Sequence, residues 1–179
     1  WDADGNLFVA EMRTYVQDVD GTGTMEPKSR IVRLTDKDGD GDMDIAVTFA
    51  EGLVLPRMVL PLDDRVLVME TNDGILWSYR DADRDGVADG REKVFEYGTS
   101  GANLEHQDSS LVWAIDNWIY SAMGSKRHRF GADGALVSEE VPHEFAQWGL
   151  ALDDLGRAWF SSAGGERAAY GFQQPAVYG

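Results

Sequence analysis

Short hydrophobic runs alternate with turns rich in aspartate, asparagine and glycine along the whole chain. In four places an apolar run leads into such a turn and a second apolar or aromatic run follows, at residues 1–9, 60–68, 112–120 and 150–160. Two β-rich runs around an Asp/Asn/Gly turn are typical of a β-hairpin, so each copy predicts one. Successive copies are offset by about 59, 53 and 39 residues, close to the roughly 40–50 residues of a propeller blade.

Further β-rich runs follow the hairpins, at residues 31–34, 45–49, 75–79, 93–95, 129–130 and 135–137. No segment shows the periodicity of an amphipathic helix of about ten or more residues. The chain is therefore predicted to be all-β. The fourfold repeat favours a β-propeller over the alternative, an irregular β-sandwich whose hairpins resemble one another by chance.

The repeat divides the chain into approximate blades at residues 1–55, 56–104, 105–146 and 147–179, within a single partial propeller domain. A blade left unpaired at its edge would expose backbone donors and acceptors. The sequence also begins without an initiator methionine or a signal peptide. We therefore expect a processed product or part of a longer protein, with about four blades of a larger ring, for which about six are expected.

Charge and composition narrow the range of partners. The chain has 32 aspartates and glutamates against 16 lysines and arginines, a formal net charge of −16. A surface this acidic argues against nucleic acid, whose phosphates are bound through lysine and arginine, and against an anionic membrane face. No apolar run approaches the roughly 20 residues of a membrane span. The absence of cysteine excludes disulfides, thiolate metal sites and covalent attachment of a c-type haem.

The most specific chemical signal is a twelve-residue aspartate loop at residues 81–92. Acidic side chains at positions 1, 3 and 5, glycine at 6, a carboxylate at 9 and glutamate at 12 complete a calcium-loop pattern. Calcium prefers about six to eight hard oxygen ligands, which alternating aspartates and a backbone carbonyl can supply as the loop winds around the ion. The predicted ligands are Asp81, Asp83, Asp85, the carbonyl of Val87, Asp89 and Glu92.

A second loop, at residues 36–44, repeats the first nine positions. Its predicted ligands are Asp36, Asp38, Asp40, the carbonyl of Asp42, and Asp44. Val47 stands where the first loop has its final glutamate, so this site is expected to be weaker, and residues 18–26 form a degenerate third copy. Because extended runs flank the first loop, we expect such loops at connections between strands, where calcium would stiffen long turns. The alternative is that they are solvated Asp-Gly turns.

Residues 103–120 read Asn-Leu-Glu-His-Gln-Asp-Ser-Ser-Leu-Val-Trp-Ala-Ile-Asp-Asn-Trp-Ile-Tyr and resemble the start of a blade in the quinoprotein glucose/sorbosone dehydrogenases. In that family a His-Gln or His-Asn pair precedes a polar stretch, an apolar strand, an aspartate turn and an apolar strand with tyrosine. The aspartate loops, together with Asp-Gly-Asn-Leu-Phe-Val-Ala-Glu-Met at residues 4–12, resemble more specifically the large membrane-bound dehydrogenase propellers of planctomycetes and their relatives.

This resemblance implies a six-bladed propeller in a secreted or periplasmic bacterial protein, and an oxidoreductase that acts on a small sugar or alcohol. His106 would be the general base, hydride would pass to pyrroloquinoline quinone beside a calcium ion, and a cytochrome c would accept the electrons.

One stretch departs from the family, since Glu144 follows His143 where the relatives carry arginine, so a cation for the cofactor's carboxylates is missing. Two alternatives remain. His106 could be an ordinary loop histidine, and the protein could be a non-catalytic, calcium-stabilised propeller that binds a glycan or a protein partner.

Overall fold

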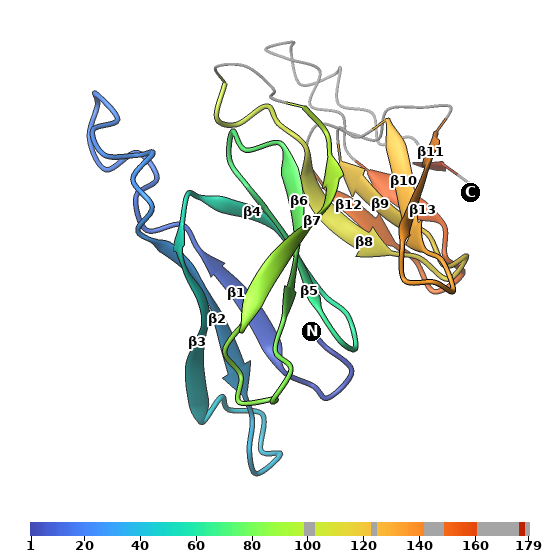
Figure 1. Ribbon diagram of the computed structural model, residues 1–179, viewed down its shortest axis with the longest axis horizontal. Coiled ribbons are helices and arrows are strands. Elements are labelled where there is room, and N and C mark those ends of the chain that lie inside the picture. Colours follow the sequence, from blue (N-terminus) through green and yellow to red (C-terminus); the bar gives the residue numbers. More distant parts are fainter. Residues whose placement is uncertain (99–102, 123–124, 142–148, 161–175, 178–179) are drawn as a thin grey trace. The chain divides into compact units, whose positions relative to one another are not determined.

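Every regular element in the computed structural model is a β-strand, as the sequence predicts (Figure 1). The structure describes residues 1–98, 103–122, 125–141, 149–160 and 176–177, which belong to two compact units, Trp1–Thr99 and Ser100–Gly179. The strands form four antiparallel sheets, in each of which neighbours in space are also neighbours along the chain. Within the described part of the chain, no helix has the length and hydrophobicity of a membrane span.

The first unit contains two sheets, a three-stranded one and a four-stranded one. The first sheet consists of β1 (Leu7–Glu11), β2 (Ser29–Thr35) and β3 (Ile45–Leu53). The second consists of β4 (Pro56–Pro61), β5 (Val66–Glu70), β6 (Ile75–Arg80) and β7 (Gly90–Glu96). Both are meanders, which form when short β-rich runs are joined by turns.

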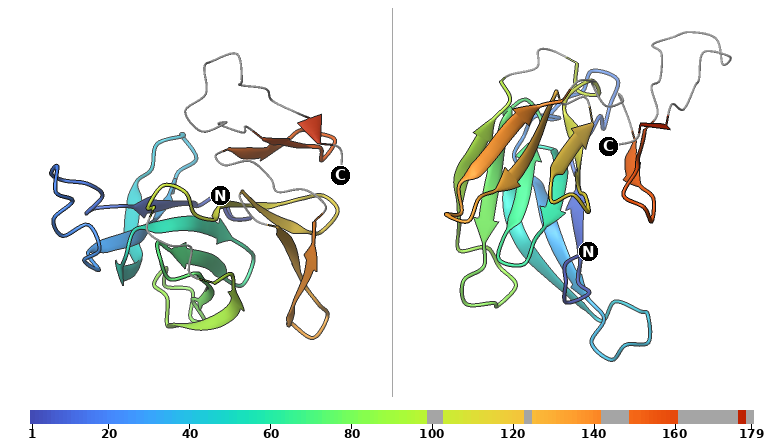
Figure 2. Two further views of the ribbon diagram at one scale, coloured as in Figure 1. Left: turned by 90° about the horizontal axis from the view of Figure 1, so that it is seen from above. Right: turned by 90° about the vertical axis from the view of Figure 1, so that its right-hand side faces the viewer.

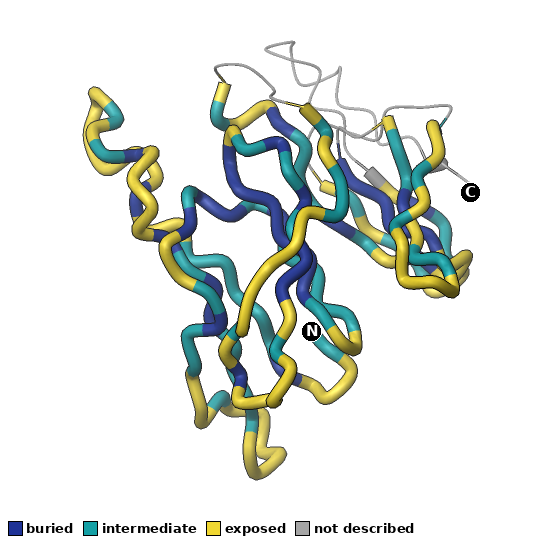
Figure 3. Tube along the Cα trace, in the orientation of Figure 1, coloured by how far each residue is buried: buried dark blue, intermediate teal, exposed yellow. Residues whose placement is uncertain are grey.

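Residues of both sheets make up the hydrophobic core of the first unit. One cluster within it joins the buried residues Ile31, Phe49, Leu53, Val66, Val68 and Tyr79. The rings of Phe8 and Phe49 meet edge to face, with their centroids 5.2 Å apart. Strand β5 is buried along its whole length, whereas β7 is mostly exposed (Figure 3). The uninterrupted apolar run at the start of β5 is therefore that of a strand covered on both faces.

Four of the aspartate-containing turns of the first unit lie at one end of its sheets, because the connections of a meander alternate between the two ends. Turns 2–6, 36–44, 62–65 and 81–89 lie at the lower end in Figure 1, and the connections 12–28 and 71–74 lie at the other. The 36–44 loop projects beyond β2 and β3 in Figures 1 and 2.

The second unit contains the remaining two sheets. One consists of β8 (Ser109–Trp113), β9 (Ile119–Ala122), β10 (Lys126–Phe130) and β11 (Leu136–Glu140). The other consists of β12 (Leu150–Leu152), β13 (Ala158–Phe160) and β14 (Ala176–Val177). Its described core contains the buried residues Ala114, Trp118, Tyr120 and Ala158.

The repeat read from the sequence reappears in the hydrogen bonds of the turns. Asp2 Oδ1 accepts the amides of Asp4 and Asn6 at 3.0 and 2.8 Å. Asp153 Oδ1 likewise accepts the amides of the residues two and four positions later, Leu155 and Arg157, at 3.0 and 2.9 Å. The hairpins predicted at residues 60–68, 112–120 and 150–160 are present as β4–β5, β8–β9 and β12–β13. In the first copy β1 follows the turn, but no strand pairs with it across that turn within the described residues, so the hairpin predicted at residues 1–9 is not seen.

Candidate metal centres

The two predicted calcium loops connect strands, the 36–44 loop joining β2 to β3 and the 81–89 loop joining β6 to β7. In each loop the first aspartate turns inward and accepts backbone amides. Asp81 Oδ2 accepts the amide of Gly86 at 2.8 Å, and Asp36 Oδ2 accepts that of Gly41 at 2.9 Å, five residues on in both cases.

The last aspartate of each loop closes the ring. Asp89 Oδ2 accepts the amide of Ala82 at 2.6 Å, and Asp44 Oδ2 accepts that of Lys37 at 2.8 Å. The loops therefore share most of their internal hydrogen bonds, although Asp36 Oδ1 accepts the amide of Gly39 whereas Asp81 Oδ1 accepts that of Asp85. Such a framework fixes the backbone so that the intervening aspartates face one another.

Each loop groups three carboxylates closely enough to share a cation. Oxygens of Asp81, Asp83 and Asp89 lie within 4.8 Å of one another, and the same holds for a second group, Asp36, Asp38 and Asp40. Like charges at this spacing repel, and a divalent ion would convert that repulsion into attraction. Carboxylate oxygens are the ligands that calcium prefers, so both groups fit the ion chemically.

The remaining predicted ligands lie outside these two groups. Asp85 Oδ1 accepts the amide of Val87 at 2.8 Å, and Asp40 Oδ1 accepts that of Asp42 at 2.8 Å, which tightens each loop. Glu92 lies on β7 and pairs in register with Ser78 of β6, and its carboxylate lies 3.8 Å from Nε of Arg80. An extended strand rises about 3.3 Å per residue, so β7 carries this glutamate away from the loop.

Hydrogen bonding also tunes the charge of the 36–44 loop. The amides of Gly41 and Gly39 hold the pKa of Asp36 below its usual range, since they stabilise the ionised carboxylate. Asp36 is therefore anionic at neutral pH, the state that cation binding requires.

The 81–89 loop also contacts the neighbouring sheet. The amide of Ala88 donates to the carbonyl of Phe49 on β3 at 2.8 Å. Gly86 is buried, has φ +93°, and a Cβ there would lie 3.1 Å from Nη1 of Arg33 and 3.5 Å from Cγ1 of Val47. The positive φ favours glycine, and a side chain here would also have to displace the end of Arg33. The contact was not predicted from the sequence, because it joins residues that are distant along the chain.

The degenerate third copy, residues 18–26, lies in the connection from β1 to β2, at the opposite end of the sheet. Asp18 Oδ1 accepts the amides of Thr22 and Asp20 at 2.9 and 3.1 Å, and Glu26 forms an ion pair with Lys28. Within the described part of the chain, these residues do not form a three-carboxylate group. The segment is a hydrogen-bonded turn.

His106 belongs to the second unit, in the connection that precedes β8, and its side chain is exposed. Nδ2 of Asn103 lies 3.1 Å from Nδ1 of His106, while Oδ1 of Asn103 accepts the amide of Glu105 at 2.9 Å. The second bond assigns the orientation of the Asn103 amide, so its NH₂ group donates to Nδ1. The neutral imidazole then carries its proton at Nε2. Gln107, the other half of the His-Gln pair, is buried and donates to the carbonyl of Asn103 at 3.0 Å.

The described cations of the second unit are already engaged. Lys126 pairs with Glu140, Arg127 with Glu139 and Arg157 with Asp153. The guanidinium of Arg129 lies over the ring of Trp118, 4.4 Å from its centroid. A cofactor with several carboxylates, such as pyrroloquinoline quinone, would need cations beyond these four described residues of the second unit. His143 and Glu144 lie outside the described residues.

Comparison with known proteins places the chain in a family. Residues 1–178 match the family described as "Domain of unknown function (DUF7133)", and a comparison with curated proteins gives no match. Similar solved structures include a luciferin-regenerating enzyme, 12% identical with a TM-score of 0.58, over 99% of this chain and 58% of that one. Another is a catalytically inactive virginiamycin B lyase from Staphylococcus aureus, crystallised with quinupristin, 14% identical with a TM-score of 0.50, over 98% and 53%.

This chain spans little more than half of each of these structures. At such low identity the likeness shows the fold alone, an all-β arrangement of the β-propeller type, in agreement with the prediction from the sequence. The chain belongs, over residues 1–178, to the DUF7133 family.

Proposed function

We propose that this chain is a calcium-stabilised part of a β-propeller, in which calcium bound by the 81–89 loop fastens one blade to the next. One observation carries the proposal. The loop that brings oxygens of Asp81, Asp83 and Asp89 within 4.8 Å of one another is also the loop whose Ala88 amide bonds to Phe49 of the neighbouring sheet.

The physical role follows from charge and geometry. The ion would be held by Asp81, Asp83 and Asp89. Its positive charge would offset the repulsion among the three carboxylates. A ligand that binds only the folded state stabilises it by about 2.7 kcal/mol at a hundredfold excess over its Kd. Because the loop covers part of the core beside Phe49 and Tyr79, that stabilisation would act on the contact between the sheets.

The four sheets occupy segments matching the four blades expected from the repeat, and we propose that they are successive blades of a ring of about six. A secreted or periplasmic location would supply the calcium that exposed loops of this type need.

Thermal unfolding of the chain in calcium chloride and in EDTA tests the calcium sites. We expect calcium to raise Tm, and the double variant Asp81→Asn/Asp83→Asn to lose most of that rise because it removes two of the three grouped charges. Asp18→Asn/Asp20→Asn, in the third copy, is the matched control and should keep the full rise. A rise in Tm of wild-type size in the first double variant, or no rise in the wild type, would refute the proposal.

A quinone-dependent sugar or alcohol dehydrogenase is the second candidate, favoured by the His-Gln pair and by an exposed imidazole that Asn103 orients. Pyrroloquinoline quinone would supply the hydride acceptor. The Asn103 contact favours the tautomer with the proton at Nε2, so His106 would have to exchange tautomer before Nε2 could act as a base.

Titration with pyrroloquinoline quinone, followed by absorbance and by dye-coupled oxidation of sugars, separates this candidate from a non-catalytic propeller that binds a glycan or protein. Loss of oxidation in His106→Ala with an unchanged Tm would support the enzyme. Absence of quinone binding by the full-length protein would leave the non-catalytic propeller.

A further inference from the structure

The sheet formed by β1, β2 and β3 has an open edge along β1. Among the residues that the structure describes, β1 pairs only with β2, whereas β5 and β9, the second strands of the four-stranded sheets, pair on both sides. Strands β5 and β9 are buried along their whole length, but every residue of β1 is only half-buried. An edge of this kind is a template for a further strand.

The turn that precedes β1 is nevertheless built as the turn of a hairpin. The amide of Asp2 donates to the carbonyl of Asn6 at 3.0 Å. The turn between β12 and β13 has the same bond, from Asp153 to Arg157, also at 3.0 Å, and there β12 enters the turn and pairs with β13. By this match, the chain that enters the turn at Asp2 runs antiparallel to β1.

The same hydrogen bond identifies which backbone groups face the open edge. Successive residues of a strand direct their N–H and C=O groups to opposite edges. Because the carbonyl of Asn6 faces the open edge, the backbone groups of Phe8 and Ala10 face it too, whereas those of Leu7 and Val9 face β2. Within the described part of the chain, the amides of Phe8 and Ala10 therefore have no partner strand.

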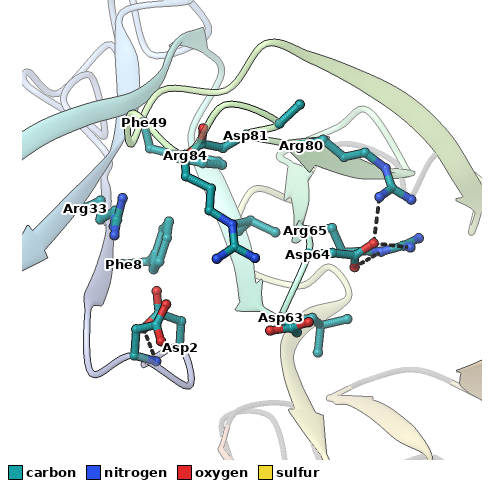
Figure 4. Close-up of a pocket in the computed structure, with 14 residues that line it drawn as sticks. Asp2, Phe8, Arg33, Phe49, Asp63, Asp64, Arg65, Arg80, Asp81 and Arg84 are labelled. Carbon is teal, nitrogen blue, oxygen red and sulfur yellow. Dashed lines mark hydrogen bonds and ion pairs between the residues drawn. The ribbon is translucent and has the colours of Figure 1, made fainter.

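One face of β1 beside this edge borders a cavity. The ring of Phe8 lines a space of about 340 Å³, together with Phe49 and the 62–65 turn (Figure 4). A residue directly opposite Phe8 on an added strand would carry its side chain on the same face, with its Cβ about 4.5–5.5 Å from that of Phe8. That side chain would cover the cavity on the side of the open edge.

The complete hairpins show which kind of side chain lies opposite this position. In the other three copies of the repeat, the residue that pairs with the counterpart of Phe8 is apolar. These pairs are Leu60 with Leu67, Val112 with Tyr120 and Ala151 with Trp159.

We propose that the open edge of β1 binds a fourth strand of the same polypeptide, formed by the residues directly before Trp1 in the full-length protein. The residue adjacent to Trp1 would be apolar and would exchange backbone hydrogen bonds with Phe8, and the residue two positions earlier would do so with Ala10. The sheet would then have four strands, as the β4–β7 and β8–β11 sheets have. This inference depends on one turn and one sheet edge, and it requires neither the calcium sites nor a particular number of blades.

Residue-resolved amide hydrogen exchange tests the proposal, in the chain Trp1–Gly179 and in the full-length protein. In the chain, the amides of Phe8 and Ala10 should exchange at least about a hundredfold faster than those of Leu7 and Val9, which report that the sheet itself is folded. In the full-length protein, the amides of Phe8 and Ala10 should be slowed to rates like those of Leu7 and Val9.

Proline variants of the full-length protein distinguish a paired strand from other ways of covering the edge. Proline in place of the residue directly before Trp1 removes the amide that would donate to Phe8, so fast exchange should return. Trp1→Pro is the matched control, because the amide of Trp1 would face away from β1. The β4–β5 hairpin carries Pro61 at this position, so slow exchange should persist.

Each other outcome would overturn the proposal. Slow exchange of Phe8 in the chain Trp1–Gly179 at every concentration would mean that the edge is not open. Slowing that appears only as the concentration rises would assign the added strand to a second copy of the chain. Fast exchange in the full-length protein, or equal exchange in the two proline variants, would exclude the fourth strand even if calcium raises Tm as expected.

Discussion

The 36–44 loop and the 81–89 loop have the same aspartate pattern and share most of their internal hydrogen bonds, yet they lie in different surroundings. Gly41 of the first loop has no atom within 4 Å of where a Cβ would stand, whereas Gly86 of the second lies against Arg33 and Val47. The residues within such a loop therefore determine how it folds, whereas the neighbouring sheet determines whether the loop helps to hold the two sheets together. The loops form a matched pair in which each can serve as the control for the other.

The largest effect is expected from a side chain at the close approach. Gly86→Val should lower the free energy of unfolding by about 4 kcal/mol, because a positive φ and crowding against Arg33 add together. Gly41→Val has only the backbone penalty and should lose about 1–2 kcal/mol. Urea unfolding measures both, and equal losses would mean that the docking of the 81–89 loop contributes little.

The second unit extends the comparison, since its described residues contain no grouping of three metal-ligating side chains. The stability of this unit is instead expected to depend on pH. Burial, with a smaller contribution from Lys126, lowers the pKa of His128 to about 4. The unfolded chain then takes up this proton near pH 6.5 and the folded chain only near pH 4. Stability is therefore complete above about pH 6.5 and falls by about 3 kcal/mol as the pH drops to about 4.

Unfolding curves between pH 4 and 7 should show this slope in the wild type and a shallower one in His128→Gln. Because the carboxylates titrate in both proteins, the difference between the curves isolates the histidine. Parallel curves would show that His128 is readily protonated in the folded state.

An effect of intermediate size is expected from removing the calcium ligands of each loop. Asp81→Asn/Asp83→Asn should reduce the stabilisation by saturating calcium by about 2 kcal/mol, and Asp36→Asn/Asp38→Asn by less, because the 36–44 loop makes no comparable contact with another sheet. Denaturant titrations with and without EDTA measure both. A larger loss in the second variant would reverse the ranking of the two loops.

The smallest effect is expected at the position with positive φ that is Arg84 in one loop and Gly39 in the other. Arg84→Gly should raise the free energy of unfolding by about 1 kcal/mol, and Gly39→Arg should lower it by a similar amount, since glycine alone is unstrained at positive φ. Thermal unfolding of the two variants gives both values. Destabilisation by Arg84→Gly would mean that its side chain supports the fold.

Local features of this protein could be predicted from its sequence. The hairpins and the position of the aspartate loops between strands follow from alternating apolar residues and turn chemistry, which act over a few residues. The grouping of Asp81 with Asp83 could also be predicted. Features that depend on tertiary packing could not be. Glu92 satisfies the loop pattern, but the register of β7 determines where it lies, and the approach of Gly86 to Arg33 and Val47 depends on how two sheets pack.

Two consecutive backbone amides follow the close approach of Gly86, and they donate to different sheets. The amide of Ala88 bonds to Phe49 on β3, and that of Asp89 bonds to Arg80 on its own hairpin, both at 2.8 Å. Exchange of the first with deuterated solvent therefore reports separation of the sheets, and exchange of the second reports fraying of one sheet. The exchange rates of two neighbouring amides thus measure two kinds of local opening separately.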